Sequence, residues 1–340
     1  MSMNIPITQN GEWQKLQEDL GETSFLITEK NYQFLAILKQ TKLGNYLYCP
    51  YGPVLENKAA LKGAMKRLRD LAKEHGAIFI RIEPTLLLTA KELEKSAREL
   101  HLKLQKSTDL NPKETWLLDL TGTDDELKSR LPSRLLRYYR SAEKNGITIE
   151  TSHNPDDIHY LLDLQKALAK KKGINTFSEN YLKTELAQPF ATLYLVRYVD
   201  DGWRPKGDPQ NVCASKILGE EADRTRSQNV IAAGLVFDDK TTRYNLQGAQ
   251  SDQGRALHAT GILTIQLILD AKAKNKRIFD FWGIAPEGAP ATHPWAGFTQ
   301  FKKTFAGYEE QHTGTYDLIL NPAKYRFYNL ARKINRKARR

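Results

Sequence analysis

The sequence predicts a mixed α/β protein that is built from two similar halves. In each half, strand-like segments lead into a long helix and then into another strand, the order that is typical of α/β sheets. The halves also share a strand that begins near an Ile-Phe pair, Ile78-Phe79 in the first and Ile278-Phe279 in the second. Because 340 residues exceed what one hydrophobic core usually covers, two domains are expected.

The first half is expected to contain a helix, a hairpin and then a long amphipathic helix, Asn57–His75. Asn57 is a plausible cap for this long helix, and an apolar stripe at helical spacing runs from Leu61 to Leu71. Two Thr-x-x-Glu capping boxes, at Thr89 and Thr123, mark further helix starts. The remaining predicted elements are helix Trp13–Leu20 and strands Ser24–Glu29, Gln33–Gln40, Tyr46–Cys49, Ala77–Ile82 and Trp116–Leu120.

The second half is expected to follow a basic helix, Ser133–Asn145, which ends at Gly146 as a C-cap. A long polar loop, Val199–Asn229, is rich in Asp, Gly, Arg, Pro and Lys, which predicts a mobile segment. Apolar residues at helical spacing predict one helix over Gly254–Asn275. The remaining predicted elements are helix Asp156–Lys171 and strands Ile147–Glu150, Ala191–Tyr198, Val230–Phe237, Thr241–Gln247 and Arg277–Trp282.

The charge of the chain favours a polyanionic partner. The formal net charge is +11, which suits nucleic acid, anionic lipid or a nucleotide-linked substrate. Basic residues crowd the C-terminal segment, and this segment is either a solvated tail or a contact for tRNA or an anionic membrane. They are Lys324, Arg326, Arg332, Lys333, Arg336, Lys337, Arg339 and Arg340.

Several functional classes lack their sequence signals. No apolar run approaches the ~20 residues that span a membrane, and Met1–Gln9 has neither the basic nor the hydrophobic region of a signal peptide. Cys49 and Cys213 stand in no spaced motif, so neither a disulfide framework nor a structural zinc site is expected, and a reducing cytoplasm fits. Gly-rich phosphate loops and nucleophile elbows are missing, and His293 is expected to be structural rather than catalytic.

Four stretches, in order along the chain, carry a resemblance to a known family. They are Tyr48–Val54, the basic segment Lys128–Gly146, the strand end Tyr244–Ala249, and Asp280–Gly283 together with Gly297–Gly307. The first is similar to a Tyr-x-Pro-Arg-Gly-Pro-Val signature, and the last contains a Phe-Lys-x-x-Phe block. Over about residues 9 to 330 the chain resembles the Fem family (FemA, FemX and relatives), nonribosomal peptidyltransferases that add amino acids to peptidoglycan precursors.

The resemblance implies a fold of two tandem GNAT-like domains, the type of the acyl-CoA N-acyltransferases. The expected division is a first domain over residues 1–146, a second over residues 147–325 that carries the catalytic lysine, and a basic C-terminal tail over residues 326–340. No heptad run of sufficient length lies between Lys171 and Ala191, so the coiled-coil arm of some relatives is not expected.

The resemblance also implies a reaction, the transfer of an aminoacyl group from aminoacyl-tRNA to the stem-peptide amine of UDP-MurNAc-pentapeptide or of lipid II. Aminoacyl-tRNA is then the co-substrate, no cofactor or metal is needed, and a monomer works in the cytoplasm or at the inner face of the membrane. Both substrates are polyanions, which suits the basic chain. Because the ester is already activated, the enzyme must mainly orient amine and ester, which supplies roughly 7–11 kcal/mol.

Lys302 is the candidate catalytic residue that the resemblance implies, with an ammonium that stabilises the oxyanion of the tetrahedral intermediate. The alternative is that Lys302 caps a carbonyl or pairs with a surface acid. Because one of two adjacent lysines must point elsewhere, Lys303 is expected to point away from the site. Candidate tRNA or phosphate contacts are Arg134, Arg137 and Arg140, or these form a solvated helix face. Candidate substrate-binding residues, in a pocket expected between the halves, are Trp13, Tyr51, Gly52, Lys172, Phe177, Tyr181, Tyr244, Gly248, Phe301 and Phe305.

Two positions depart from the family pattern. Tyr51 stands where the family usually has arginine, and Gln17 replaces a lysine that is expected four residues after Trp13. Recognition of phosphate or peptide is therefore expected to differ. Tyr244 either binds substrate through its hydroxyl or only packs against neighbouring side chains of the fold.

Two other functions remain open on the sequence. Because a fold does not determine the acyl donor, the first is an N-acyltransferase that uses acyl-CoA. The second is a non-catalytic basic protein that binds RNA or a membrane.

Overall fold

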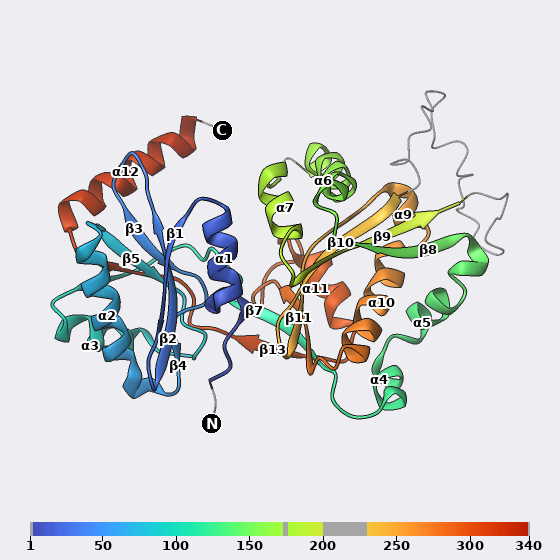
Figure 1. Cartoon of the computed structure of the whole chain (residues 1–340), viewed down its shortest axis with the longest axis horizontal. Helices are drawn as coiled ribbons and strands as arrows, with labels where there is room; N and C mark the ends of the chain where they lie inside the picture. Colours follow the sequence, from blue (N-terminus) through green and yellow to red (C-terminus); the bar gives the residue numbers. More distant parts are fainter. Residues whose placement is uncertain (1–2, 173–175, 200–229, 339–340) are drawn as a thin grey trace. The chain divides into compact units, whose positions relative to one another are not determined.

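The computed structural model of the chain (Figure 1) describes residues 3–172, 176–199 and 230–338. The predicted loop Val199–Asn229 lies, apart from its first residue, outside the described residues. The chain forms two compact units. The first contains Met1–Thr115, Ala285–Ala289 and Glu310–Arg340, and the second contains Trp116–Ile284 and Pro290–Glu309.

The first unit is built on a seven-stranded mixed sheet with the order β1-β2-β3-β5-β14-β6, and β4 (Val54–Leu55) pairs with β2. Strands β3 and β5 run parallel, whereas the other pairs in this unit are antiparallel. The strands are β1 (Thr23–Thr28), β2 (Tyr32–Lys39), β3 (Tyr46–Cys49), β5 (Phe79–Ile82), β6 (Lys103–Lys106) and β14 (Tyr316–Ile319). The helices are α1 (Gly11–Asp19), α2 (Leu61–Glu74), α3 (Ala90–Glu99) and α12 (Pro322–Ala338).

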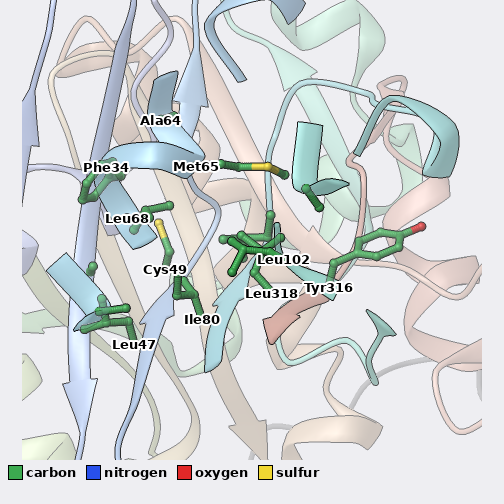
Figure 2. Close-up of a cluster of buried hydrophobic side chains, with 14 of the residues drawn as sticks. Phe34, Leu47, Cys49, Ala64, Met65, Leu68, Ile80, Leu102, Tyr316 and Leu318 are labelled. Atoms are coloured by element: carbon green, nitrogen blue, oxygen red, sulfur yellow. The ribbon is translucent and has the colours of Figure 1, made fainter. Parts of the chain in front are cut away.

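The predicted apolar stripe of α2 forms one side of the core of the first unit. Leu61, Ala64, Leu68 and Leu71 are all buried. Figure 2 shows Ala64, Met65 and Leu68 of this helix with Phe34, Leu47 and Ile80 of the sheet. Asn57 accepts a hydrogen bond from the Ala59 amide and so caps the short 3-10 turn Lys58–Ala60, which leads into α2, whereas the N-cap of α2 itself is Ala60. The helix therefore forms where local rules place it, and the strands β2, β3 and β5 receive its apolar face.

The C-terminal strand β14 completes the sheet of the first unit. It lies between β5 and β6, and a buried ion pair ties it to β5, because Arg81 donates from Nε and Nη2 to the two carboxylate oxygens of Asp317 at 2.8 Å each. The Tyr325 hydroxyl of α12 donates to the same carboxylate at 2.7 Å. The described residues of the predicted tail, 326–338, are therefore not separate from this unit, since α12 begins at Pro322, continues to Ala338 and packs Tyr325 and Tyr328 into it.

The second unit holds most of another seven-stranded mixed sheet, with the order β13-β7-β12-β11-β10-β9-β8. Strands β11 and β12 run parallel, and β8, β9, β10 and β11 pair antiparallel in succession. The strands are β7 (Glu114–Asp119), β8 (Ile147–Ser152), β9 (Ala191–Tyr198), β10 (Val230–Asp238), β11 (Thr242–Gln250), β12 (Ile278–Gly283) and β13 (Tyr308–Gln311). The helices are α4 (Asp124–Arg130), α5 (Ser133–Arg140), α6 (Ile158–Lys172), α7 (Glu179–Leu186), α9 (Asp252–Ala256), α10 (Ala259–Ala273) and α11 (Ala296–Lys303).

The two sheets share one construction, which agrees with the internal repeat seen in the sequence. In each, antiparallel strands lead through a long helix to a parallel neighbour: β3, α2 and β5 in the first, and β11, α10 and β12 in the second. The mixed α/β prediction is confirmed. Among the described residues, no helix combines the length and the apolar composition needed to cross a bilayer.

The division of the chain differs from the predicted one. Residue 146 lies within the second unit, which begins at Trp116, because Leu118, Leu127 and Leu136 join the core around α10. The predicted helix over Gly254–Asn275 is two helices, since His258 adopts a left-handed conformation with φ +57° between α9 and α10. The basic helix α5 ends at Arg140, five residues earlier than expected, although Gly146 takes the left-handed C-cap conformation after a short 3-10 turn.

Candidate active site

A pocket of about 660 Å³ lies within the second unit. One wall is strand β11 with its neighbour β10, a second is the first half of α10, and a third is α11. Its polar lining includes Asn245, Gln250, Arg255, His258, Thr260, Thr264 and Lys302, and its apolar lining includes Leu135, Leu263, Phe281, Phe298 and Phe301. The size suits a small ligand or one end of a larger one.

Lys302 contributes its side chain to the wall of this pocket. It stands in the last turn of α11, and its Nζ donates to the carbonyl oxygen of Gly283 at 2.6 Å. That carbonyl lies at the end of β12, just after Trp282, which has a φ of +67°. The Trp282 amide donates to Oδ1 of Asp280 at 2.7 Å, so the Asp280 carboxylate supports the turn that presents the acceptor of Lys302.

The electrostatic environment of Lys302 is unusual for a lysine. Burial lowers the pKa of its ammonium to about 8, and the charge of Asp280 only partly opposes this shift. The ammonium therefore titrates near neutral pH. A lysine in this state can present a cation to a developing negative charge, or accept a proton when it is neutral.

Lys303 points away from Lys302, as predicted. Its Nζ lies 3.6 Å from the Glu309 carboxylate and 5.4 Å from the centre of the Trp116 ring. Of the other predicted residues in this block, Phe301 lines the pocket, whereas Phe305 is fully buried against Phe281 in the core. Gly248 of β11 also lines the pocket.

The basic helix α5 reaches the same pocket through an aromatic pair. The ring of Tyr138 stacks on His258 with centroids 4.4 Å apart and planes within 5°. Arg134 donates to the Tyr138 hydroxyl at 2.8 Å, and the guanidinium groups of Arg134 and Arg137 lie 5.5 and 5.7 Å from the centre of the Tyr138 ring. Because His258 lines the pocket, the Tyr138 ring that Arg134 and Arg137 contact stacks directly on a pocket residue. Arg140 is exposed further along the helix.

Tyr244 takes a buried position in the sheet of the second unit. Its hydroxyl donates to Asp239 at 2.7 Å, and its ring meets Trp282 edge to face at 6.3 Å. These contacts are those of the packing alternative. His293 makes a local contact, in which its Nδ1 accepts from the Trp295 amide at 3.1 Å.

The segment from Lys172 to Tyr181 is only partly described. Lys172 is the last residue of α6, and its side chain lies outside the described residues. Phe177 is 54% exposed and stacks on Tyr181 with ring centroids 5.1 Å apart. Burial and the neighbouring Glu185 carboxyl raise the pKa of the Tyr181 hydroxyl far above its usual value.

The three predicted residues of the first unit are buried. Trp13 lies on α1, and elsewhere in the unit the Tyr51 hydroxyl donates to the Pro112 carbonyl at 2.9 Å. Gly52 is closely packed, since a Cβ there would overlap the side chain of Gln9. Gln17, which stands in place of the expected lysine, is also buried. These positions are therefore part of the packing of the first unit.

One polar cluster in the second unit was missed by the sequence analysis. Glu185 of α7 is 2% exposed, and its carboxyl accepts from Nε2 of Gln247 on β11 at 2.8 Å. Nε2 of Gln165 on α6 donates to Gln247 at 3.2 Å. Burial raises the pKa of Glu185 to about 8, against the effect of hydrogen bonds from Tyr181 and Gln247. The consecutive helices α6 and α7 meet the distant strand β11 here, and each residue alone gives no signal.

The described residues contain no group of three or more His, Cys, Asp or Glu side chains that could hold a metal ion. The polar groups that line the pocket include Lys302 and the side chains of Asn245, Gln250, Thr260 and Thr264.

Comparison with known proteins adds to this geometry. A model of the FemAB family matches residues 6–192 and 215–333. The chain belongs to the FemAB family. The family resemblance seen in the motifs is thereby confirmed.

One curated protein is similar to this chain in sequence, and two solved structures are similar to it in fold. A lipid II:glycine glycyltransferase of Staphylococcus epidermidis is 22% identical over 326 residues, which cover 82% of this chain and 76% of the relative. The crystal structure of FemX superposes with a TM-score of 0.73 at 18% identity and covers 96% of this chain and 95% of that chain. The structure of L-PGS from Bacillus licheniformis matches with a TM-score of 0.52 at 12% identity and covers 98% of this chain and 99% of that chain. The likeness to these two structures shows a shared mixed α/β fold, and the tandem GNAT-like type stays a prediction.

Proposed function

We propose that this FemAB protein transfers an aminoacyl group from aminoacyl-tRNA to the stem-peptide amine of a peptidoglycan precursor, either UDP-MurNAc-pentapeptide or its lipid-linked form. The observation that carries the proposal is Lys302, a partly buried ammonium in the wall of a pocket in the second unit. The similarity to a protein named lipid II:glycine glycyltransferase supports the class of acceptor. The net charge of +11 supports two polyanionic substrates.

The reaction needs little besides orientation and charge stabilisation. The amine nitrogen attacks the ester carbonyl carbon, a C–N bond forms, and the carbonyl oxygen becomes an oxyanion. The ammonium of Lys302 stabilises that oxyanion, and one such donor typically contributes roughly 10²–10³-fold to turnover. The C–O bond to the ribose then breaks, and the proton that leaves the amine ends on the ribose oxygen.

The donor is proposed to enter at the rim formed by α5 and the first turn of α10. The stacked pair of Tyr138 and His258 offers an aromatic surface beside the pocket, and aromatic surfaces of this kind bind nucleobases. Arg134 and Arg137 add positive charge next to the same ring. A nucleotide at the 3′ end of tRNA needs both features, a stacking surface for the base and cations for the phosphates.

A second candidate is an N-acyltransferase that takes its acyl group from acyl-CoA. One observation favours it: the N-terminal turn of α10, with Thr260 and Gly261, lines the pocket. Helix N-termini bind phosphate groups through their backbone amides. The same turn suits a phosphate of tRNA equally well, so experiment has to decide which donor binds there.

The deciding experiment offers three donors to the purified full chain. These are a pool of tRNA charged with radiolabelled amino acids, the same amino acids free in solution, and radiolabelled acetyl-CoA. UDP-MurNAc-pentapeptide and lipid II serve as the acceptors, and mass spectrometry identifies the product. A gain of one aminoacyl residue on either acceptor, only with charged tRNA, is the expected result.

Transfer of an acetyl group from acetyl-CoA instead would establish the second candidate and refute the first. Transfer to neither acceptor from any donor would refute both. The identity of the transferred amino acid follows from the mass increment.

A further inference from the structure

Helix α12 is held to the first unit by one face. Tyr325 and Tyr328 are each 4% exposed, and their rings contact Phe79 with centroids 5.1 Å apart in both cases. The Tyr325 hydroxyl also donates to Asp317, the buried carboxylate that pairs with Arg81. The helix is therefore fixed in orientation on its own unit.

The opposite face of α12 is apolar and exposed. Phe327, Leu330 and Ile334 are 61%, 58% and 59% exposed. At 100° per residue these three side chains fall within about 60° of one another, on the side of the helix away from Tyr325 and Tyr328. Three large apolar side chains in one exposed stripe are an unusual feature for a surface that faces only water.

Basic residues border this apolar stripe. Arg326 and Lys333 are exposed along one edge, and Lys324 is exposed along the other. Arg332 lies on the inner side, where its guanidinium is 5.7 Å from the centre of the Tyr328 ring. The described part of the helix, residues 322–338, contains no Asp or Glu. An apolar stripe flanked by cations is the pattern of a helix that lies in the interface of an anionic membrane.

We infer that α12 binds the surface of an anionic lipid bilayer, with Phe327, Leu330 and Ile334 inserted among the acyl chains and the flanking cations on the headgroups. The apolar residues favour a membrane over RNA, because RNA phosphates attract charge and offer no apolar region to this stripe. The cations favour a membrane over an apolar protein partner, since the cores of protein interfaces are poor in lysine. This binding requires neither an acyl donor nor an acceptor.

The test is co-sedimentation of the full chain with two kinds of vesicle, one that contains phosphatidylglycerol and one of phosphatidylcholine only. The expected result is strong binding to the anionic vesicles that weakens as salt rises. The variant with Phe327→Asn, Leu330→Gln and Ile334→Gln is expected to lose roughly tenfold or more in affinity. The variant with Arg326→Gln and Lys333→Gln is expected to lose roughly fivefold for each charge removed.

Matched controls change the same chemistry elsewhere in the first unit. Leu87→Gln with Leu110→Gln removes two exposed apolar side chains, and Lys91→Gln with Lys95→Gln removes two exposed charges from α3. Both are expected to bind the anionic vesicles as the unaltered chain does. Circular dichroism checks that every variant is folded. If the apolar variant does not fold, the charge variant still tests the inference.

Three results would overturn the inference. The full chain could stay in the supernatant with both vesicles, or the α12 variants could bind as tightly as their controls. The apolar variant could instead change only self-association, measured by ultracentrifugation, or only affinity for tRNA, which would assign the stripe to a second copy of the chain or to RNA. Each result leaves the proposed transfer reaction untouched, because that reaction is measured with UDP-MurNAc-pentapeptide in the absence of vesicles.

Discussion

The ammonium of Lys302 donates to the carbonyl oxygen of Gly283 across 2.6 Å. A backbone carbonyl holds the side chain in position without neutralising it, whereas a carboxylate at this distance would have paired the charge. Burial lowers the pKa of this ammonium to about 8, and the charge of Asp280 opposes the shift only in part. The arrangement provides a positioned cation that can leave or share its hydrogen bond when an oxyanion forms nearby.

Replacement of Lys302 by glutamine is expected to lower turnover by roughly 10²–10³-fold, because the oxyanion loses a charged donor. Lys303→Gln is the matched control, since Lys303 is adjacent in sequence but lies against Glu309 and Trp116. Loss of that exposed pair should change turnover by no more than about fivefold. The measurement is the rate of aminoacyl transfer at saturating substrates, and equal losses in the two variants would refute the assignment.

The role of Lys302 also predicts the direction of a pH dependence. If the protonated side chain stabilises the oxyanion, turnover falls as the pH rises through about 8, where the ammonium loses its proton. Lys302→Arg keeps the charge at all these pH values, so its residual activity should not show that fall. Initial rates are measured between pH 6 and pH 9.5, a range chosen to bracket that pKa. A rise through pH 8 that disappears in the arginine variant would make Lys302 a base instead.

Removal of the Lys302 charge should stabilise the folded chain, although it lowers turnover. The pKa of Lys302 is lower in the folded chain than its usual 10.5, so the unfolded chain binds the extra proton between about pH 8 and 10.5. Below pH 8 the folded state carries the full cost of the buried charge, which is about 3 kcal/mol at most. The lost hydrogen bond to Gly283 offsets about 1 kcal/mol of any gain. Lys302→Met is therefore expected to raise the free energy of unfolding by about 2 kcal/mol at pH 7, measured by urea denaturation. A free energy of unfolding below that of the unaltered chain would make Lys302 a structural residue.

Local rules predicted much of the fold. The capping boxes at Thr89 and Thr123 form as expected, with both reciprocal hydrogen bonds in each. The predicted hairpin forms from β1 and β2. These features depend on neighbours within a few residues, which is why the sequence reveals them.

Non-local pairing was not predictable in the same way. Strand β6 is a short, polar segment, and it becomes a strand because β14, more than two hundred residues later, pairs with it. The break at His258 was missed because no glycine or proline marks it between α9 and α10. Lys302 was found through the family resemblance, but its partner Gly283 and the cluster around Glu185 depend on contacts between distant segments.

Arg134 and Arg137 of α5 are expected to contribute part of the affinity for RNA. Arg134→Gln with Arg137→Gln should weaken binding of uncharged tRNA at low salt and reduce the slope of log affinity against log salt by about 1 to 2, because each phosphate contact contributes roughly 0.7–0.9. Lys103→Gln with Lys106→Gln removes two exposed charges from β6 and is the control for net charge. Filter binding across a salt series gives both slopes, and identical slopes for the two variants would exclude these arginines from the interface.

The buried carboxyl of Glu185 is expected to make the stability of the chain depend on pH. Its folded pKa of about 8 lies above its usual 4.5, so between these values the folded chain binds more protons than the unfolded chain. This contribution is fully present below pH 4.5 and is lost as the pH rises through 8. Glu185→Gln mimics the protonated form and should remove that loss, which amounts to about 2 kcal/mol or more between pH 5.5 and 8.

Glu179→Gln removes an exposed carboxylate from the same helix and serves as the matched control for this prediction. Urea denaturation of both variants and of the unaltered chain at pH 5.5 and 8 isolates the effect of burial from that of charge. Only Glu185→Gln should flatten the pH dependence, because only there does the folded chain exclude water from the carboxyl and supply Gln247 as its donor at 2.8 Å. If the two variants lose stability equally over this range, the carboxyl of Glu185 is ionised in the folded chain and the cluster does not hold its proton.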